Sequence, residues 1–286
     1  MTTAAPAESR VLPESRRVAL FVSVILVPAV VVLWGLPDRT ADLWAWTIRP
    51  DLTPIFIGAG FAAGSFFFWQ TFRAERWHPS SAGVISASGF AALMLIATLI
   101  HWDRFNHGDA PVLAATAFYA WTGLYIVSPL MLLAVWLRNR RTDRGIPDAR
   151  DGAVPRGARL AARIVAVAVL AAAAVGFLTP QTAIDLWPWQ LSPLTARVLA
   201  GFTAQVGIAA LVLSFDSRWS AWRLIVQSFF VATAFLLVGA LRAWDDFDHG
   251  NPMTWLYLAG LLASAAALGA LYRRMESSIA AVAPRI

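Results

Sequence analysis

Apolar and polar residues alternate along the chain in long blocks, and charged residues are confined to the short segments between the apolar ones. A helix of about 20 apolar residues spans the roughly 30 Å hydrocarbon core of a bilayer. Each apolar block is about that long: 18–36, 54–72, 81–101, 112–137, 160–178, 196–214, 221–241 and 253–272. The blocks are continuous, whereas strands of a membrane β-barrel alternate between apolar and polar. The pattern predicts an all-α integral membrane protein with about eight transmembrane helices.

Rare residues recur in the same order in the two halves of the chain. An Asp-Leu-Trp-x-Trp element at 42–46 returns at 185–189, and a Trp-Asp-x-Phe-x-His-Gly element at 102–108 returns at 244–250. Each half holds an even number of spans, so the second half re-enters the membrane in the orientation of the first. We therefore expect two parallel-oriented four-helix repeats, related by a pseudo-twofold axis along the membrane normal.

This interpretation divides the chain into five segments. They are an N-terminal tail (1–17), a first repeat (18–137), a linker (138–159), a second repeat (160–272) and a C-terminal tail (273–286). All 23 basic residues are Arg, and 18 of them lie in or beside the two tails, the linker and the loops on the same side. Basic residues favour the cytoplasmic side. We expect the protein to lie in the cytoplasmic membrane of a bacterial cell, with both termini on the cytoplasmic side. We also expect the first span to be retained rather than cleaved as a signal peptide.

Composition supports this class and excludes others. Hydrophobic residues make up 58% and charged residues 14% of the chain, against about 25% charged in soluble domains. There is no Cys, which excludes disulfides, thiolate nucleophiles and Cys-bound metals. The net charge of +6 is explained by the Arg residues gathered on the side predicted to be cytoplasmic. The charge therefore does not call for a nucleic-acid partner, and none is predicted.

The Trp-rich elements have a structural and a functional interpretation. Indole rings suit the headgroup zone of a bilayer, so a short amphipathic segment on the outer leaflet is one interpretation. The other is an aromatic-lined groove for a lipid or isoprenoid tail. The candidate lipid or interface aromatics are Trp44, Trp46, Trp187, Trp189, Trp102 and Trp244.

The second repeated element carries the candidate chemistry. Asp103 and His107 are spaced i, i+4, as are Asp245 and His249, so each pair would share one helix face. Carboxylate and imidazole bind divalent ions or act as acid and base. No cofactor is predicted. The alternative of a divalent metal rests on these four residues, to which His101, Asp109, Asp246 and Asp248 would add ligands. The candidate polar site is Asp103, His107, Asp245, Asp246, Asp248, His249, Arg242 and Arg197.

A structural interpretation of the same element is a tight corner between helices. Gly108 and Gly250 would follow helix ends, and Asn251-Pro252 reads as an N-cap followed by the first helical residue. Arg197 and Arg242 replace apolar residues of the first half. Arg242 would pair with Asp245 or Asp246, or both Arg would bind an anionic headgroup.

Two further features bear on packing and function. Ala259, Ala263 and Ala267 predict close packing of the last span. No Asp, Glu, Lys or His falls at mid-membrane depth within the blocks, which disfavours an ion-coupled transporter.

The expected function is a membrane scaffold or accessory subunit that presents a pseudo-twofold extracytoplasmic surface to a lipid or protein partner. The alternatives are an enzyme acting on a lipid-linked substrate through the Asp/His pairs, and a transporter.

Overall fold

The computed structural model describes residues 9–143, 145 and 151–282. Eight of its helices are long and apolar enough to cross a membrane, which confirms an all-α multi-pass membrane protein. The first span is α1 (Pro13–Val30), which ends in a π-helical turn, η1 (Val31–Gly35). The other seven are α3 (Leu52–Arg73), α4 (His78–Ile100), α5 (Val112–Arg140), α6 (Arg156–Leu178), α8 (Pro193–Leu213), α9 (Trp219–Arg242) and α10 (Pro252–Val282).

Short helical turns connect the spans. They are η2 (Pro37–Arg39), α2 (Thr40–Leu43), η3 (Trp102–Arg104), α7 (Pro180–Leu186) and η4 (Trp244–Asp246). The spans run past several predicted boundaries. Both ends of the predicted linker are helical, and α10 continues through the predicted C-terminal tail to Val282. The extension of α10 is held by Glu276, which accepts hydrogen bonds from Trp219 and Arg223 of α9.

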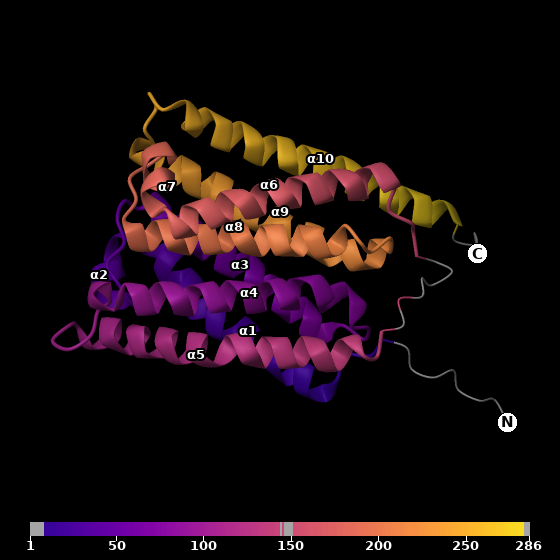
Figure 1. Cartoon of the computed structure of the whole chain (residues 1–286), viewed down its shortest axis with the longest axis horizontal. Helices are drawn as coiled ribbons and strands as arrows, with labels where there is room; N and C mark the ends of the chain where they lie inside the picture. The colour runs from indigo at the N-terminus through magenta and orange to yellow at the C-terminus, as the bar shows by residue number, and fades with distance from the viewer. Residues whose placement is uncertain (1–8, 144, 146–150, 283–286) are drawn as a thin grey trace.

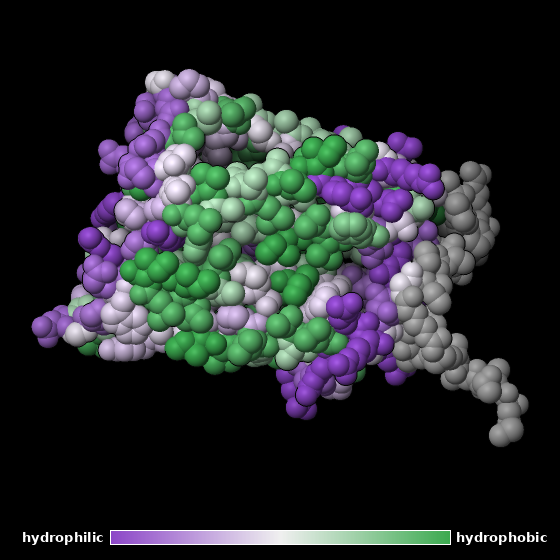
Figure 2. All heavy atoms as spheres, viewed as in Figure 1, coloured by the Kyte–Doolittle hydropathy of each residue, from purple (hydrophilic) through white to green (hydrophobic). Residues whose placement is uncertain are grey.

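The bundle has two polar ends and an apolar middle. The start of α1 and the end of α10 lie at one end, which we call the terminal end (Figure 1). The opposite end carries α2, α7 and both Trp-Asp-x-Phe-x-His-Gly elements, and we call it the corner end. Figure 2 shows apolar side chains forming a band between these ends. Such a band is what a bilayer core requires of the helices that face it.

Four helices form the centre of the bundle. α3 packs against α9, α4 packs against α8, and α4 also contacts α9. We call the first two contacts the α3–α9 seam and the α4–α8 seam. The outer helices cover the centre, with α1 on α3, α5 on α4 and α6 on α8. Helices at matching positions of the two halves therefore make matching contacts.

The last helix breaks this match. α5 packs closely along α4, whereas α10 makes few contacts with α9. In the apolar 18-residue stretch of α10 only 6% of the residues are buried. The corresponding share is 22% in each of the spans that contain α1, α5 and α6. Ala259, Ala263 and Ala267 are exposed, so no helix in the described part of the chain packs closely against this Ala row. Between Tyr257 and Tyr272 α10 has no aromatic side chain with which to fill the space beside it.

The α3–α9 seam depends on a glycine. A Cβ added to Gly239 of α9 would overlap the branched side chain of Ile55 of α3. Overpacking of this kind costs about 1–3 kcal/mol. We expect Gly239→Ala to lower the unfolding temperature of the detergent-solubilised protein. Gly123→Ala is the control, because Gly123 has open space around its Cβ position. An unchanged unfolding temperature for Gly239→Ala would show that Ile55 moves aside at no cost.

Candidate functional site

The corners are not continuous helices. α4 ends at Ile100, a single 3-10 turn follows at Trp102–Arg104, and the chain is then irregular up to α5. The second corner repeats this with η4 after α9. The prediction that Asp and His share a helix face is therefore wrong. Gly108 does adopt a left-handed conformation, with φ of 65°, but it lies in the loop and not directly after a helix.

In the first corner, Asp103 and His107 have different partners. Asp103 pairs with its neighbour Arg104 at 3.3 Å, and both side chains are largely exposed. His107 donates from Nε2 to the backbone carbonyl of Trp102 at 3.3 Å. Its ring also packs near the rings of Trp102 and Phe118. The two side chains do not converge on one site.

In the second corner, Asp246 and Asp248 stabilise the backbone. Asp246 Oδ2 accepts a hydrogen bond of 2.9 Å from the N–H of Leu52, at the start of α3 in the other half. Asp248 Oδ1 accepts one of 3.0 Å from the N–H of Gly250. Asn251 Oδ1 accepts from the N–H of Met253 at 2.9 Å, so the predicted N-cap before Pro252 is confirmed.

Asp245 and His249 lie at the surface of the same corner. Asp245 is exposed. The His249 ring lies 5.0 Å from that of Trp244 and 6.5 Å from that of Trp255, and its carbonyl accepts from Trp255 Nε1. In the part of the chain that the structure describes, no group of three or more His, Asp or Glu side chains is placed to hold a metal ion.

Arg197 and Arg242 lie in different contacts between the halves. Arg197 Nη1 donates to Nε2 of His101 at 2.7 Å, across the α4–α8 seam. Arg242 Nη1 donates to the carbonyl of Trp34 at 2.6 Å, and its guanidinium carbon lies 4.5 Å from the centre of that indole ring. The predicted pairing of Arg242 with Asp245 or Asp246 is wrong, because the carbonyl and ring face of Trp34 hold the guanidinium instead.

Most of the Trp-rich elements turn inward. Trp44, Trp46 and Trp189 are 9%, 2% and 3% exposed. Trp46 packs edge-on against Trp121 with ring centres 4.9 Å apart, and Trp189 donates to Thr53 Oγ1 at 2.9 Å. The prediction that these rings lie among lipid headgroups is therefore wrong, since edge-to-face packing buries them in a shared aromatic core.

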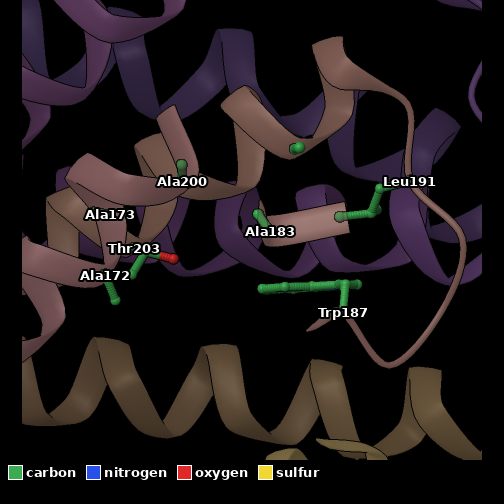
Figure 3. A pocket seen from close by; sticks show the side chains of 9 residues that line it. Ala172, Ala173, Ala183, Trp187, Leu191, Ala200 and Thr203 are labelled. Atoms are coloured by element: carbon green, nitrogen blue, oxygen red, sulfur yellow. The ribbon is translucent and has the colours of Figure 1, made fainter. Parts of the chain in front are cut away.

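Trp102 and Trp244, by contrast, are 43% and 37% exposed at the corner end. Trp187 is half-buried and lines a cavity of about 80 Å³. Figure 3 shows this cavity, with a stretch of α10 running alongside. Its lining comes from α6, α7, α8 and the segment between α7 and α8: Ala172, Ala173, Gly176, Ala183, Trp187, Leu191, Ala196, Ala200 and Thr203.

The lining of the cavity is almost entirely apolar. The hydroxyl of Thr203 is bonded to the carbonyl of Leu199 in its own helix. Trp187 Nε1 is buried and has no hydrogen-bond partner among the described residues. The other lining side chains are apolar, so the cavity suits an alkyl group and offers no charged contact.

A polar network at the terminal end was missed by the sequence analysis. His78 opens α4 and Ser220 lies in the first turn of α9, and His78 Nε2 is 2.8 Å from Ser220 Oγ. Ser220 donates its hydroxyl proton to Asp151, so in the contact with His78 the imidazole donates. Ser9 accepts from the N–H of His78, as Asp151 accepts from the N–H of Ser220.

Arg218, just before α9, is the most buried charge of this network. It is 8% exposed, holds Asp143 in a bidentate contact at 2.8 and 2.9 Å, and holds Asp216 at 2.7 Å. Burial acts to raise the pKa of Asp143. The hydrogen bonds from Arg218 and from the N–H of Gly145 outweigh burial and hold that pKa below its usual value. The Arg-Trp pair at 76–77 recurs at 218–219, but Asp143, which Arg218 holds in the bidentate contact, lies 75 residues away along the chain.

Comparison of the chain with models of protein families, with curated proteins and with solved structures gives no match.

Proposed function

We propose that this chain is a non-enzymatic membrane scaffold or accessory subunit that holds a lipid chain at its corner end. The observation that carries this proposal is the apolar cavity lined by Trp187 between α6, α7 and α8. It lies beside α10, the least buried span. Ala172, in the wall of the cavity, is exposed, which gives a lipid chain in the bilayer a route to it.

The size and lining of the cavity indicate which part of a lipid would enter. Pockets for whole small molecules usually measure about 300–1,000 Å³, and this cavity is only about 80 Å³. It has room for one end of an alkyl or isoprenoid chain and none for a headgroup. Small side chains such as Ala172, Ala183 and Ala200 form most of its wall, so larger side chains there would close it.

The polar residues of the corner end support a scaffold more than an enzyme. Asp246, Arg197 and Arg242 each contact the other half of the chain. Asp103 and His107 have separate partners. These polar side chains thus mainly hold the loops and helix ends of the corner end in place. The exposed Trp102 and Trp244 remain available to a membrane lipid or a membrane protein partner.

We infer two further points about the whole chain. The matching helix contacts and the recurring sequence elements support an origin by tandem duplication of a four-helix unit. The concentration of Arg in the terminal-end loops supports a cytoplasmic location of that end, in a bacterial inner membrane.

Photo-crosslinking tests the lipid site. The purified protein would be reconstituted with a phospholipid that carries a diazirine near the end of one acyl chain, irradiated, and digested for mass spectrometry. We expect crosslinks concentrated on the segments around Ala183, Trp187 and Thr203. Ala172→Leu should reduce these crosslinks several-fold, because Ala172 is exposed and lines the cavity.

Ala174→Leu is the matched control, since Ala174 is also exposed on α6 and does not line the cavity. It should leave the crosslinks unchanged. Labelling spread evenly over all lipid-facing helices and unaffected by Ala172→Leu would overturn the proposal. Ala183→Leu, on α7, provides a second closing variant if Ala172→Leu is poorly folded.

A further inference from the structure

One hydrogen bond between the halves joins two groups that are both able to carry positive charge. Arg197 of α8 donates from Nη1 to Nε2 of His101, the residue that caps the end of α4, at 2.7 Å. The equivalent positions of the first and second half hold Ile55 and Ala243. The α3–α9 seam therefore has no such contact, and the Arg197–His101 pair is particular to the α4–α8 seam.

The chemistry of the pair fixes the protonation state of His101. A guanidinium has N–H groups and no lone pair to offer, so it can only donate. His101 Nε2 must then be the acceptor, which requires a neutral imidazole whose proton is on Nδ1. A protonated imidazole carries a proton on both nitrogens. It would present a second donor and a second positive charge to Arg197 at hydrogen-bond distance.

The surroundings do little to offset such a charge. The charged groups that face His101 are Arg197 from α8 and Asp103 and Arg104 from η3. Asp103 is already paired with Arg104. Among the described ion pairs none includes Arg197, and its Nε is buried without a hydrogen-bond partner.

We propose that the Arg197–His101 hydrogen bond is an acid-sensitive contact between the two halves, which protonation of His101 breaks, loosening α8 from α4 at the corner end. The proposal is independent of what the cavity beside Trp187 binds. It gives the protein a response to the pH of the medium at its corner end.

The direction of the response follows from the environment of His101. Burial lowers the pKa of His101 below its usual value, and the charge of Arg197 lowers it further. A His with a lowered pKa favours the closed contact when it is neutral. The stabilisation is therefore complete above about pH 6.5, the usual pKa of His. It is lost as the pH falls through the lowered pKa of the closed state.

Nuclear magnetic resonance of the four His residues gives a direct test of the pair. The protein would be labelled with ¹³C and ¹⁵N at His, and the His101 signal assigned by its loss in His101→Gln. We expect His101 to titrate below pH 6.5 and its pKa to rise in Arg197→Gln. A His101 pKa that is the same in wild type and in Arg197→Gln would overturn the proposal.

Spin-label distances test the movement, and the absence of Cys from the chain makes labelling specific. One pair, Leu99→Cys with Gln190→Cys, places labels at exposed positions beside the α4–α8 seam. The control pair, Thr47→Cys with Leu241→Cys, places labels at exposed positions beside the α3–α9 seam. We expect acidification to lengthen or broaden the first distance distribution and to leave the second unchanged.

His101→Gln separates protonation from packing. Its side-chain oxygen still accepts from Arg197 but does not titrate, so the first pair should keep its neutral-pH distance on acidification. Distances that do not change with pH in the wild type would contradict the proposal. So would distances that change equally at both seams, or a response that persists in His101→Gln.

Discussion

Arg218→Ala is expected to destabilise the protein by about 3–5 kcal/mol, the usual effect of removing one partner from a buried ion pair. Arg218 is 8% exposed and bridges Asp143, after the last turn of α5, to Asp216, before α9. Its removal leaves two partly buried carboxylates facing each other without a cation. The measurement is the loss of folded protein in a chemical or thermal unfolding series in detergent.

Arg223→Ala is the matched control for this result. Arg223 also lies at the terminal end and pairs with Glu276, but its side chain is 51% exposed. Exposed pairs contribute about 0–1 kcal/mol, so the expected loss is small. Equal losses for the two variants would show that the burial of Arg218 does not matter.

The same ion pair has a predicted pH dependence. Because the pKa of Asp143 is held below its usual value, its contribution to stability is fully present above about pH 3.9, the usual Asp pKa. It is lost only as the pH falls through the lowered pKa. Between pH 5 and 8 the contribution of the Asp143 carboxylate should therefore stay constant, whereas the Arg197–His101 contact should change within or just below that range.

Trp46→Ala is expected to have the second large effect, again about 3–5 kcal/mol. The Trp46 ring is 2% exposed and packs against Phe105 and Trp121 with ring centres 5.3 and 4.9 Å apart. Its loss leaves a cavity in the aromatic core that joins the first corner to α5. The same unfolding series measures it.

Trp69→Ala tests whether burial rather than residue type decides the effect. Trp69 of α3 is 42% exposed, and among the described residues its one neighbouring ring is that of Phe72. We expect a clearly smaller loss than for Trp46→Ala. If both variants lose the same stability, the inward packing of the Asp-Leu-Trp-x-Trp element is not what holds the corner end together.

The helices were predictable because the property that forms them is local. In lipid, a span such as α4 must satisfy its backbone hydrogen bonds within its own helix. Its apolar residues form one continuous run, which can be recognised in the sequence. The helix ends were less predictable. α10 continues beyond its apolar run because Glu276 on the extension bonds Trp219 and Arg223, and no local pattern reports such a contact.

The candidate site was harder to predict for the same reason. The spacing of Asp103 and His107 suggested one helix face, but α4 had already ended at Ile100. The indoles of Trp44 and Trp46 were assigned to the headgroup zone, although Trp121 of α5 covers them. Partners such as His101 for Arg197 come from different halves of the chain, so only the folded arrangement brings them together.

A density map of the protein in a lipid nanodisc tests the central claim most directly. We predict an elongated, chain-like density that enters the cavity beside Trp187 between α6, α7 and α8, with α10 standing alongside. A map in which α10 closes onto α6 and α8 and the cavity contains no density would contradict it.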